Sequence, residues 1–232
     1  MAAPFQFKQF AVAHHRATMP VGTDAVLLGA WAKQLLPKRI LDVGTGCGII
    51  ALMLAQRYAG AVIEAVDYDA TSVEEAAENF KNSPFAERLT AKQADFREFE
   101  SSTKYDLIVS NPPYFNTKIK PTDESRRLAR STETLPYPAL VKGIAGLLAP
   151  NGSFCCVLPA NAIKEISLTA EHYGLKLNEL LYIKYNTRTE PSVALIRYSF
   201  IDMPLQIDKL ILHTNDGKRS NAYVELVKEF YL

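Results

Sequence analysis

Short apolar runs alternate with amphipathic stretches of helical spacing through the middle of the chain. Runs that predict buried strands occupy residues 39–43, 61–66, 89–93, 106–110 and 153–158, and stretches that predict helices occupy residues 49–58, 70–82 and 137–148. Parallel strands need long crossover connections, which helices of this length supply. The pattern therefore predicts an α/β fold, with a mostly parallel sheet covered by helices on both faces.

The two flanks of this core have shorter patterns. Residues 5–10 alternate apolar and polar and predict a short edge strand, and Thr23 is a candidate N-cap for a helix over residues 24–36 that Pro37 ends. Residues 180–185 and 192–200 predict two strands, which should be antiparallel because the turn between them is too short for a crossover. Residues 220–231 predict a closing amphipathic helix. We expect one domain over residues 1–232, with an N-terminal extension (1–38), a core (39–158) and a C-terminal hairpin and helix (159–232).

Composition and charge narrow the class of protein. A chain of 232 residues is long enough for one α/β domain and too short for two ordinary ones, and 48% hydrophobic residues exclude general disorder. The net charge is only +1, so any contact with nucleic acid must be a local patch. Neither a signal peptide nor an apolar run long enough to cross a membrane is present, and Cys47, Cys155 and Cys156 lack C-x-x-C spacing. We expect a soluble cytoplasmic protein with reduced thiols.

Three glycines at alternate positions follow the first core strand. Gly44, Gly46 and Gly48 join that strand to the helix over residues 49–58. Glycine lets the backbone turn sharply and approach a ligand closely, because no Cβ intervenes. The spacing G-x-G-x-G differs from the G-x-G-x-x-G that cradles a dinucleotide pyrophosphate. It favours S-adenosyl-L-methionine, which has no phosphate.

Acidic residues lie at the ends of the first three core strands. Asp67 closes the second strand, 23 residues after Gly44, where a carboxylate can accept hydrogen bonds from both ribose hydroxyls. Asp95 follows the third strand and is a candidate acceptor for the adenine amine, with Phe96 as an apolar wall. Together with Asp42 at the glycine loop, these residues predict a cofactor site at one edge of the sheet.

The sequence Asn111-Pro112-Pro113-Tyr114 follows the fourth core strand directly. Open α/β sheets bind ligands at the carboxyl ends of their strands. Prolines donate no N–H, and Asn111 is held extended by the proline after it, so its oxygen and the Pro112 carbonyl remain available as acceptors. A proline turn that merely ends a strand is the alternative.

Such a pair of acceptors suits the methylation of a planar amine. The lone pair of an adenine amine is delocalised into the ring, and two acceptors that take both N–H bonds favour a pyramidal nitrogen whose lone pair can attack. Positive charge that develops on the nitrogen then meets preorganised dipoles. Tyr114 offers a ring on which the planar group can stack.

These motifs resemble the class I, Rossmann-like methyltransferases of the Asn-Pro-Pro-Tyr branch. The resemblance covers residues 39–158 and implies a seven-stranded, mostly parallel sheet with an antiparallel C-terminal hairpin. The block Met19-Pro20-Val21-Gly22-Thr23-Asp24, the run Arg126-Arg127-Leu128-Ala129-Arg130 and the ending Phe230-Tyr231-Leu232 are similar to bacterial tRNA (adenine-N6)-methyltransferases. That family modifies the adenosine beside the anticodon of a valine tRNA. The resemblance implies an enzyme with an RNA partner.

The resemblance also implies roles for individual residues. Gly44, Gly46 and Asp67 would hold the cofactor, with Asp95 at its adenine. Thr23 and Asp24 would lie near its methionine end. Residues 111–114 would hold the target amine.

A basic segment follows the tetrapeptide. Residues 116–131 carry five cations and two anions, a local net charge of +3; the cations are Lys118, Lys120, Arg126, Arg127 and Arg130. Their place beside the tetrapeptide favours contacts to the phosphates that flank a bound nucleotide, to which Arg16, Lys218 and Arg219 are candidate additions. A solvated loop of mixed charge is the alternative.

Two other features predict no chemistry. His14 and His15 lack the spaced partners that a metal site needs, so we expect no metal. Trp31 falls on the apolar face of the first predicted helix, where a core position is the ordinary interpretation.

Several functions remain open beside RNA adenine-N6 methylation. A protein glutamine amide is also planar, but enzymes of that kind carry a helical domain before the fold, and only about 38 residues precede the first core strand here. Ribosomal RNA and DNA amines are closer alternatives. A non-catalytic module that binds S-adenosylmethionine or RNA would not need the intact tetrapeptide, and the glycine spacing disfavours a nicotinamide dehydrogenase. The sequence identifies neither the RNA, nor the nucleotide position, nor the oligomeric state.

Overall fold

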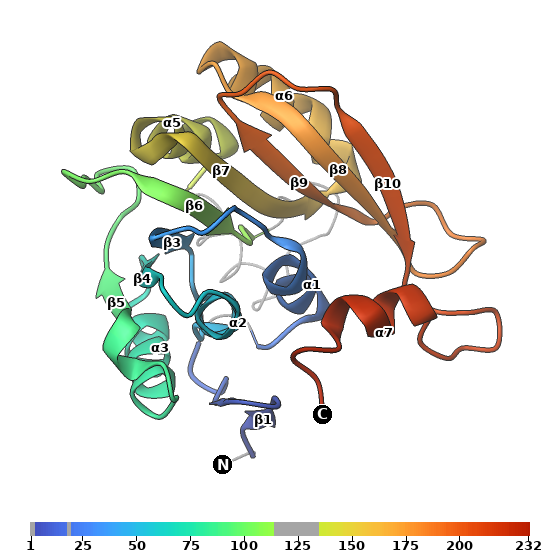
Figure 1. The fold of residues 1–232 in the computed structure, drawn as a ribbon, viewed down its shortest axis with the longest axis horizontal. Helices are drawn as coiled ribbons and strands as arrows, with labels where there is room; N and C mark the ends of the chain where they lie inside the picture. Colours follow the sequence, from blue (N-terminus) through green and yellow to red (C-terminus); the bar gives the residue numbers. More distant parts are fainter. Residues whose placement is uncertain (1–2, 18–19, 114–134) are drawn as a thin grey trace, which may run out of the picture.

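Eight strands form one twisted sheet that runs through the molecule (Figure 1). The computed structural model describes residues 3–17, 20–113 and 135–232. The order across the sheet is β10-β8-β9-β7-β6-β3-β4-β5. The bounds are β3 (Arg39–Val43), β4 (Val62–Asp67), β5 (Leu89–Gln93), β6 (Tyr105–Ser110), β7 (Leu148–Pro159), β8 (Lys176–Lys184), β9 (Val193–Ser199) and β10 (Gln206–Ile211).

The strand directions confirm the predicted fold class. Strands β5, β4, β3, β6 and β7 are parallel, and β9 is antiparallel to both β7 and β8. The predicted antiparallel pair is therefore confirmed. The eighth strand, β10, pairs parallel to β8 and was not expected. Its first four residues are exposed, so its sequence lacks the apolar run or the regular alternation that predicts a strand.

Alternate residues of the strands enter two separate cores. In β3, Ile40 belongs to the core beneath helices α1 (Thr23–Trp31) and α2 (Ile49–Arg57), whereas Leu41 belongs to the core beneath α5 (Tyr137–Leu147) and α6 (Ile163–His172). Leu107 and Ile108 of β6 divide in the same way. Each face of the sheet is thus covered by helices, as the alternation of elements predicts.

The three helices predicted within the core agree closely with α2, α3 (Ala70–Lys81) and α5, whereas the closing helix is shorter than the predicted residues 220–231. The helix α3 has a side-chain N-cap, since Asp69 accepts a hydrogen bond from the backbone of Ser72 at 2.8 Å. The last helix, α7 (Asn221–Val227), is capped by Ser220 in the same way. Helix α6 was not predicted. Within the described ranges, no helix combines the length and the apolar character that a membrane crossing requires.

The N-terminal region differs from its prediction. Residues 5–10 do not form one edge strand; β1 (Phe5–Gln6) and β2 (Ala11–Val12) make a small antiparallel pair of their own. Gly22 is the N-cap of α1 and makes no side-chain cap bond, so Thr23 is the first helical residue and not the cap. The helix ends at Trp31, well before Pro37, because Ala32 already has an extended ψ of 127°. Trp31 is partly buried and packs against the core.

Candidate active site

A pocket of about 300 Å³ opens at the carboxyl ends of the parallel strands. Loops after β3, β4, β5 and β6 meet there with the start of α1, because parallel strands end at one edge of a sheet. Its lining residues are Pro20, Gly22, Thr23, Asp24, Ala25, Val43, Gly44, Thr45, Gly46, Cys47, Ile49, Ile50, Val66, Asp67, Tyr68, Asp69, Ala94, Asp95, Phe96, Asn111, Pro112, Pro113 and Leu135. The sequence prediction of a ligand site at this edge agrees with this pocket.

Two different structural requirements favour glycine at the three glycine positions of the loop after β3. All three have positive φ, at 72° for Gly44, 55° for Gly46 and 82° for Gly48. A Cβ on Gly44 or Gly46 would meet no atom within 4 Å, so these two leave open space in the pocket wall. A Cβ on Gly48 would lie 2.5 Å from the Phe80 ring, and Gly48 does not line the pocket. In the structure Gly48 thus packs against α3 and does not lie in the pocket wall.

Asp67 lines the pocket beside the glycine loop, as predicted. Its carboxylate accepts hydrogen bonds from the backbone N–H of Gly46 at 2.8 Å and of Asp69 at 3.0 Å. Burial raises the pKa of Asp67 despite these donors. Two fixed N–H contacts leave further lone pairs on the carboxylate, so it can still accept from a ligand hydroxyl.

Asp42 has a different place from the one predicted. It is fully buried and does not line the pocket. One carboxylate oxygen accepts from the Thr45 hydroxyl at 2.7 Å, while the other has no hydrogen-bond partner among the described residues. Burial raises its pKa to about 7. Asp42 therefore fixes the glycine loop through its hydrogen bond with Thr45. It does not line the pocket in which the sequence had predicted it to contact a cofactor.

Asp95 and Phe96 both line the pocket, at the end of β5. The side chain of Arg97 hydrogen-bonds the Asp95 carboxylate, with Nε 2.9 and 3.0 Å from its two oxygens, and this pairing lowers the pKa of Asp95. Phe96 is almost fully buried, and a Cβ on Gly143 of α5 would come within 2.6 Å of its ring. The ring is thereby fixed as an apolar wall.

Other lining residues were missed by the sequence analysis. Tyr68 and Asp69 follow Asp67 directly, and the Tyr68 side chain is 58% exposed. They could have been predicted from their position in the loop after β4, because this loop lies at the carboxyl ends of the parallel strands, where the pocket opens. Thr23 and Asp24 line the pocket from α1, in agreement with the placement that the resemblance implied.

Asn111, Pro112 and Pro113 form the wall of the pocket at the end of β6. The strand end is tied to β3 because the buried Ser110 hydroxyl donates to the Val43 carbonyl at 2.9 Å. Asn111 is partly exposed, and no hydrogen bond joins its side chain to any described part of the chain. Tyr114 lies outside the described residues.

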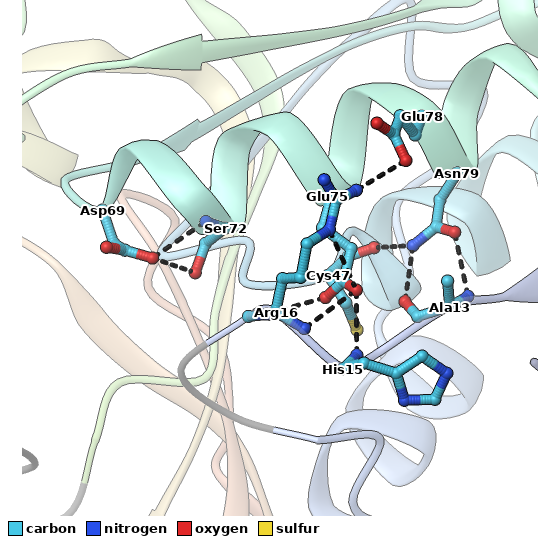
Figure 2. A network of polar contacts seen from close by, with 10 residues as sticks. Ala13, His15, Arg16, Cys47, Asp69, Ser72, Glu75, Glu78 and Asn79 are labelled. Carbon is cyan, nitrogen blue, oxygen red and sulfur yellow. Dashed lines mark hydrogen bonds and ion pairs between the residues drawn. The ribbon is translucent and has the colours of Figure 1, made fainter. Parts of the chain in front are cut away.

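Helix α3 braces the pocket from outside (Figure 2). The buried Glu75 carboxylate accepts hydrogen bonds from three consecutive backbone N–H groups, those of His15 (2.8 Å), Arg16 (3.0 Å) and Ala17 (2.7 Å). One turn further on, the Asn79 amide donates 2.8 Å hydrogen bonds to the carbonyls of Ala13 and Cys47.

This bracing joins two parts of the pocket wall to the N-terminal segment. The segment that Glu75 holds leads towards Pro20, and Cys47 belongs to the glycine loop. Asp69, the N-cap of the same helix, lines the pocket itself. One helix therefore sets the relative positions of segments that are far apart in the sequence.

The structure describes only part of the predicted basic patch. Lys118, Lys120, Arg126, Arg127 and Arg130 lie outside the described residues. Arg16 is turned towards α3, where Nη2 lies 2.5 Å from Glu78 and Nε 3.9 Å from Glu75. Its predicted contact with substrate is corrected to an ion pair with the helix. Lys218 lies 3.3 Å from Asp216, and the Arg219 guanidinium lies over the Tyr223 ring.

The histidines and cysteines have no catalytic arrangement in the described ranges. His14 and His15 contact each other, and in residues 3–17, 20–113 and 135–232 no three potential metal ligands lie together. Cys47, Cys155 and Cys156 are buried free thiols, and burial raises the pKa of each. Such thiols are poor nucleophiles at neutral pH.

Comparison with solved structures supports the fold alone. A predicted O-methyltransferase from Agrobacterium tumefaciens superposes with a TM-score of 0.69 at 16% identity, over 89% of this chain and 96% of that one. The sheet order, the glycine loop and the pocket at the strand ends define the class of methyltransferases with a Rossmann-like fold.

Sequence comparison is more specific. The methyltransferase small domain family matches residues 15–161. A tRNA1(Val) (adenine(37)-N6)-methyltransferase of Bacteroides fragilis is 42% identical over all of this chain and 99% of its own length. The protein of the same name from Enterobacter sp. is 41% identical over 98% of this chain and 94% of its own length. The chain belongs to the family of tRNA1(Val) (adenine(37)-N6)-methyltransferases, a family of S-adenosylmethionine-dependent enzymes.

Proposed function

We propose that this protein transfers a methyl group from S-adenosylmethionine to the N6 amine of adenosine 37 in tRNA1(Val). Full-length relatives at about 40% identity carry this activity in their names. The observation that carries the proposal is the position of Asn111 and Pro112 in the wall of the same pocket as Asp67 and Gly44. An acceptor pair and a cofactor site are thus adjacent.

The pocket residues fit the chemical groups of the cofactor. Asp67 has lone pairs left for ribose hydroxyls, and the open side of Gly44 and Gly46 admits close approach of a ligand to the backbone. Asp95 supplies an acceptor and Phe96 an apolar surface for an adenine. Thr23 and Asp24 offer polar groups for a charged methionine end. When bound, the cofactor supplies an electrophilic methyl group on a positively charged sulfur.

The chain contributes orientation and electrostatics to the reaction. The Asn111 side-chain oxygen and the Pro112 carbonyl accept the two N–H bonds of the adenine amine and hold its nitrogen at the pocket. This geometry frees the nitrogen lone pair, and the two fixed dipoles stabilise the positive charge that develops on nitrogen. Tyr114 stacks on the extruded base. No general base is required, because the product ammonium is acidic enough to lose its proton to water.

The substrate class is tested by a methyl-transfer assay with tritiated S-adenosylmethionine. The acceptors are bulk tRNA from cells that lack the modification, ribosomal RNA, and a release-factor protein as the source of a glutamine amide. We expect label in tRNA alone. Label confined to the protein would exclude RNA as the substrate, and label confined to ribosomal RNA would exclude tRNA.

A further inference from the structure

Two loops lie at the same sheet edge as the acceptor pair but outside the pocket. They are the β8–β9 loop (residues 185–192) and the β10–α7 turn (residues 212–220). Strands β6, β7, β8 and β10 all run in one direction, so the loop after β8 and the turn after β10 leave the sheet at the edge where Asn111 ends β6. With strands about 4.8 Å apart, β8 lies about 14 Å from β6 across the sheet.

The loop and the turn are fastened to each other. The Thr187 hydroxyl donates to Asn215 at 2.9 Å, and the His213 N–H donates to the Tyr185 carbonyl at 2.9 Å. The Tyr185 and His213 rings lie 4.5 Å apart between centroids. Figure 1 shows the two segments next to each other beside β10 and α7. They therefore form one surface, which we call the joined-loop surface.

Each segment is also ordered internally. In the β8–β9 loop the Asn186 side chain accepts from the backbone N–H of Arg188 at 2.9 Å and of Thr189 at 3.1 Å. In the β10–α7 turn the Thr214 N–H donates to the Lys218 carbonyl at 2.9 Å, and Gly217 supplies the positive φ. The side chains of the surface are thus presented on a fixed backbone, which lowers the entropy cost of binding.

The exposed groups of this surface combine an aromatic ring with cations. Tyr185 is 57% exposed, and Arg188 is exposed with no partner for its guanidinium among the described residues. The Lys218 side chain is 83% exposed, and its only described ion pair is a 3.3 Å contact with Asp216. Within these two segments three cations, Arg188, Lys218 and Arg219, outnumber two anions, Glu190 and Asp216.

This combination matches single-stranded nucleic acid better than protein. Unpaired bases stack on exposed aromatic rings, and arginine and lysine contact the phosphates between them. Tyr185 is the only large exposed hydrophobic side chain of these two segments, so the surface lacks the apolar area on which protein interfaces depend.

We propose that the joined-loop surface binds single-stranded RNA beside the target adenosine, with Tyr185 stacked on a base and with Arg188 and Lys218 on phosphates. The inference rests on the proposed function, because it takes a loop of tRNA as the substrate. The register places Ser110 of β6 level with Leu180 of β8, and Tyr185 lies five residues further along the chain. The contacted nucleotides therefore lie roughly 20 Å from the base held at Asn111, a separation of several nucleotides.

The test uses the full chain, unmodified tRNA1(Val), and two readouts: the dissociation constant for tRNA as a function of salt, and the separate values of kcat and KM. Tyr185→Ala should weaken tRNA binding about 5- to 100-fold, whereas Tyr185→Phe should retain it. The double variant Arg188→Ala/Lys218→Ala should raise KM for tRNA and reduce the slope of log K against log salt by about 1.4. The dissociation constant for the cofactor and kcat at saturating tRNA should stay at the wild-type values.

Lys38→Ala is the matched control, because Lys38 is exposed and precedes β3 at the opposite edge of the sheet. It should leave KM for tRNA and the salt slope unchanged. If wild type methylates tRNA and the loop variants bind tRNA like wild type, the RNA surface is wrong and the proposed function stands. If the wild-type protein transfers no methyl group to tRNA, the proposed function is wrong. The proposal that the joined-loop surface binds substrate RNA is then wrong as well. Loss of methylation of a protein acceptor in the loop variants would assign the surface to protein binding instead.

Discussion

Replacing Asn111 with alanine should lower the rate of methyl transfer on the order of 100- to 1,000-fold and leave cofactor affinity almost unchanged. The variant loses one of two acceptors that hold the amine, which is comparable with the loss of one preorganised polar group, about 3–4 kcal/mol of barrier. The Asn111 side chain makes no hydrogen bond to the described residues, so we expect its truncation to leave the described part of the fold intact. Single-turnover rates with tRNA, measured beside the dissociation constant of S-adenosylmethionine, separate the two effects.

Asn151→Ala is the control for this experiment. Asn151 is an exposed asparagine near the start of β7, at the opposite edge of the sheet, and should leave the rate at the wild-type value. A large loss of cofactor affinity in Asn111→Ala, with normal turnover of the bound complex, would make Asn111 a cofactor residue and contradict the assignment.

Replacing Glu75 with alanine should have the largest effect on the architecture of the pocket. Three backbone N–H groups lose a charged acceptor, which should lower the free energy of unfolding by about 2–3 kcal/mol. Because the released segment leads towards Pro20 and the start of α1, cofactor affinity should fall as well. Denaturant unfolding and cofactor titration of the same preparation measure both quantities.

The pH dependence of the unfolding free energy should show that the Glu75 carboxylate causes this loss of stability. Burial alone would raise the pKa of Glu75, but the three N–H donors and Arg16 outweigh it, so the pKa lies below its ordinary value of 4.5. A lowered pKa stabilises the fold at pH values above 4.5, and this contribution disappears as the pH falls through the lowered value. The difference in unfolding free energy between wild type and Glu75→Ala should therefore be constant near neutral pH and shrink in acid.

Glu74→Ala is the matched control on the same helix, since Glu74 is exposed and has no described partner. It should change neither the unfolding free energy nor cofactor affinity. Equal effects of the two substitutions would contradict the bracing role of Glu75.

The sequence pattern predicted the central strands, whose residues are buried, and missed the edge strand β10, whose start is exposed. Strands such as β3 and β6 are continuous apolar runs because both of their faces enter a core. The edge strand β10 has an exposed start, so its partner β8 determines its conformation more than its own sequence does. The early end of α1 also depends on tertiary contacts, since the Gln34 N–H donates to the Tyr58 hydroxyl.

The sequence predicted the position of a residue best where its place in the chain sets its place in space. Gly44, Gly46 and Asp67 end strands or begin the loops after them, and parallel strands end at one edge. Spacing says less about the direction of a side chain. Asp42 points into the interior, and Gly48 faces the Phe80 ring.

The interaction partners of a charged residue could not be predicted from the sequence either. Arg16 pairs with Glu78, 62 positions away, and the three N–H groups on Glu75 come from a segment about 60 residues earlier. Such contacts depend on how α3 packs against the N-terminal segment. A local count of charges does not contain that information.

The acceptor pair at the end of β6 is proposed to hold an exocyclic amine while S-adenosylmethionine methylates its nitrogen. The most direct measurement is the chemical identity and position of the product, by nuclease digestion and mass spectrometry of tRNA1(Val) after reaction with the enzyme and S-adenosylmethionine. We expect N6-methyladenosine at position 37 and at no other nucleotide. A methyl group on a ring nitrogen such as N1, or on a ribose 2′-oxygen, would contradict it.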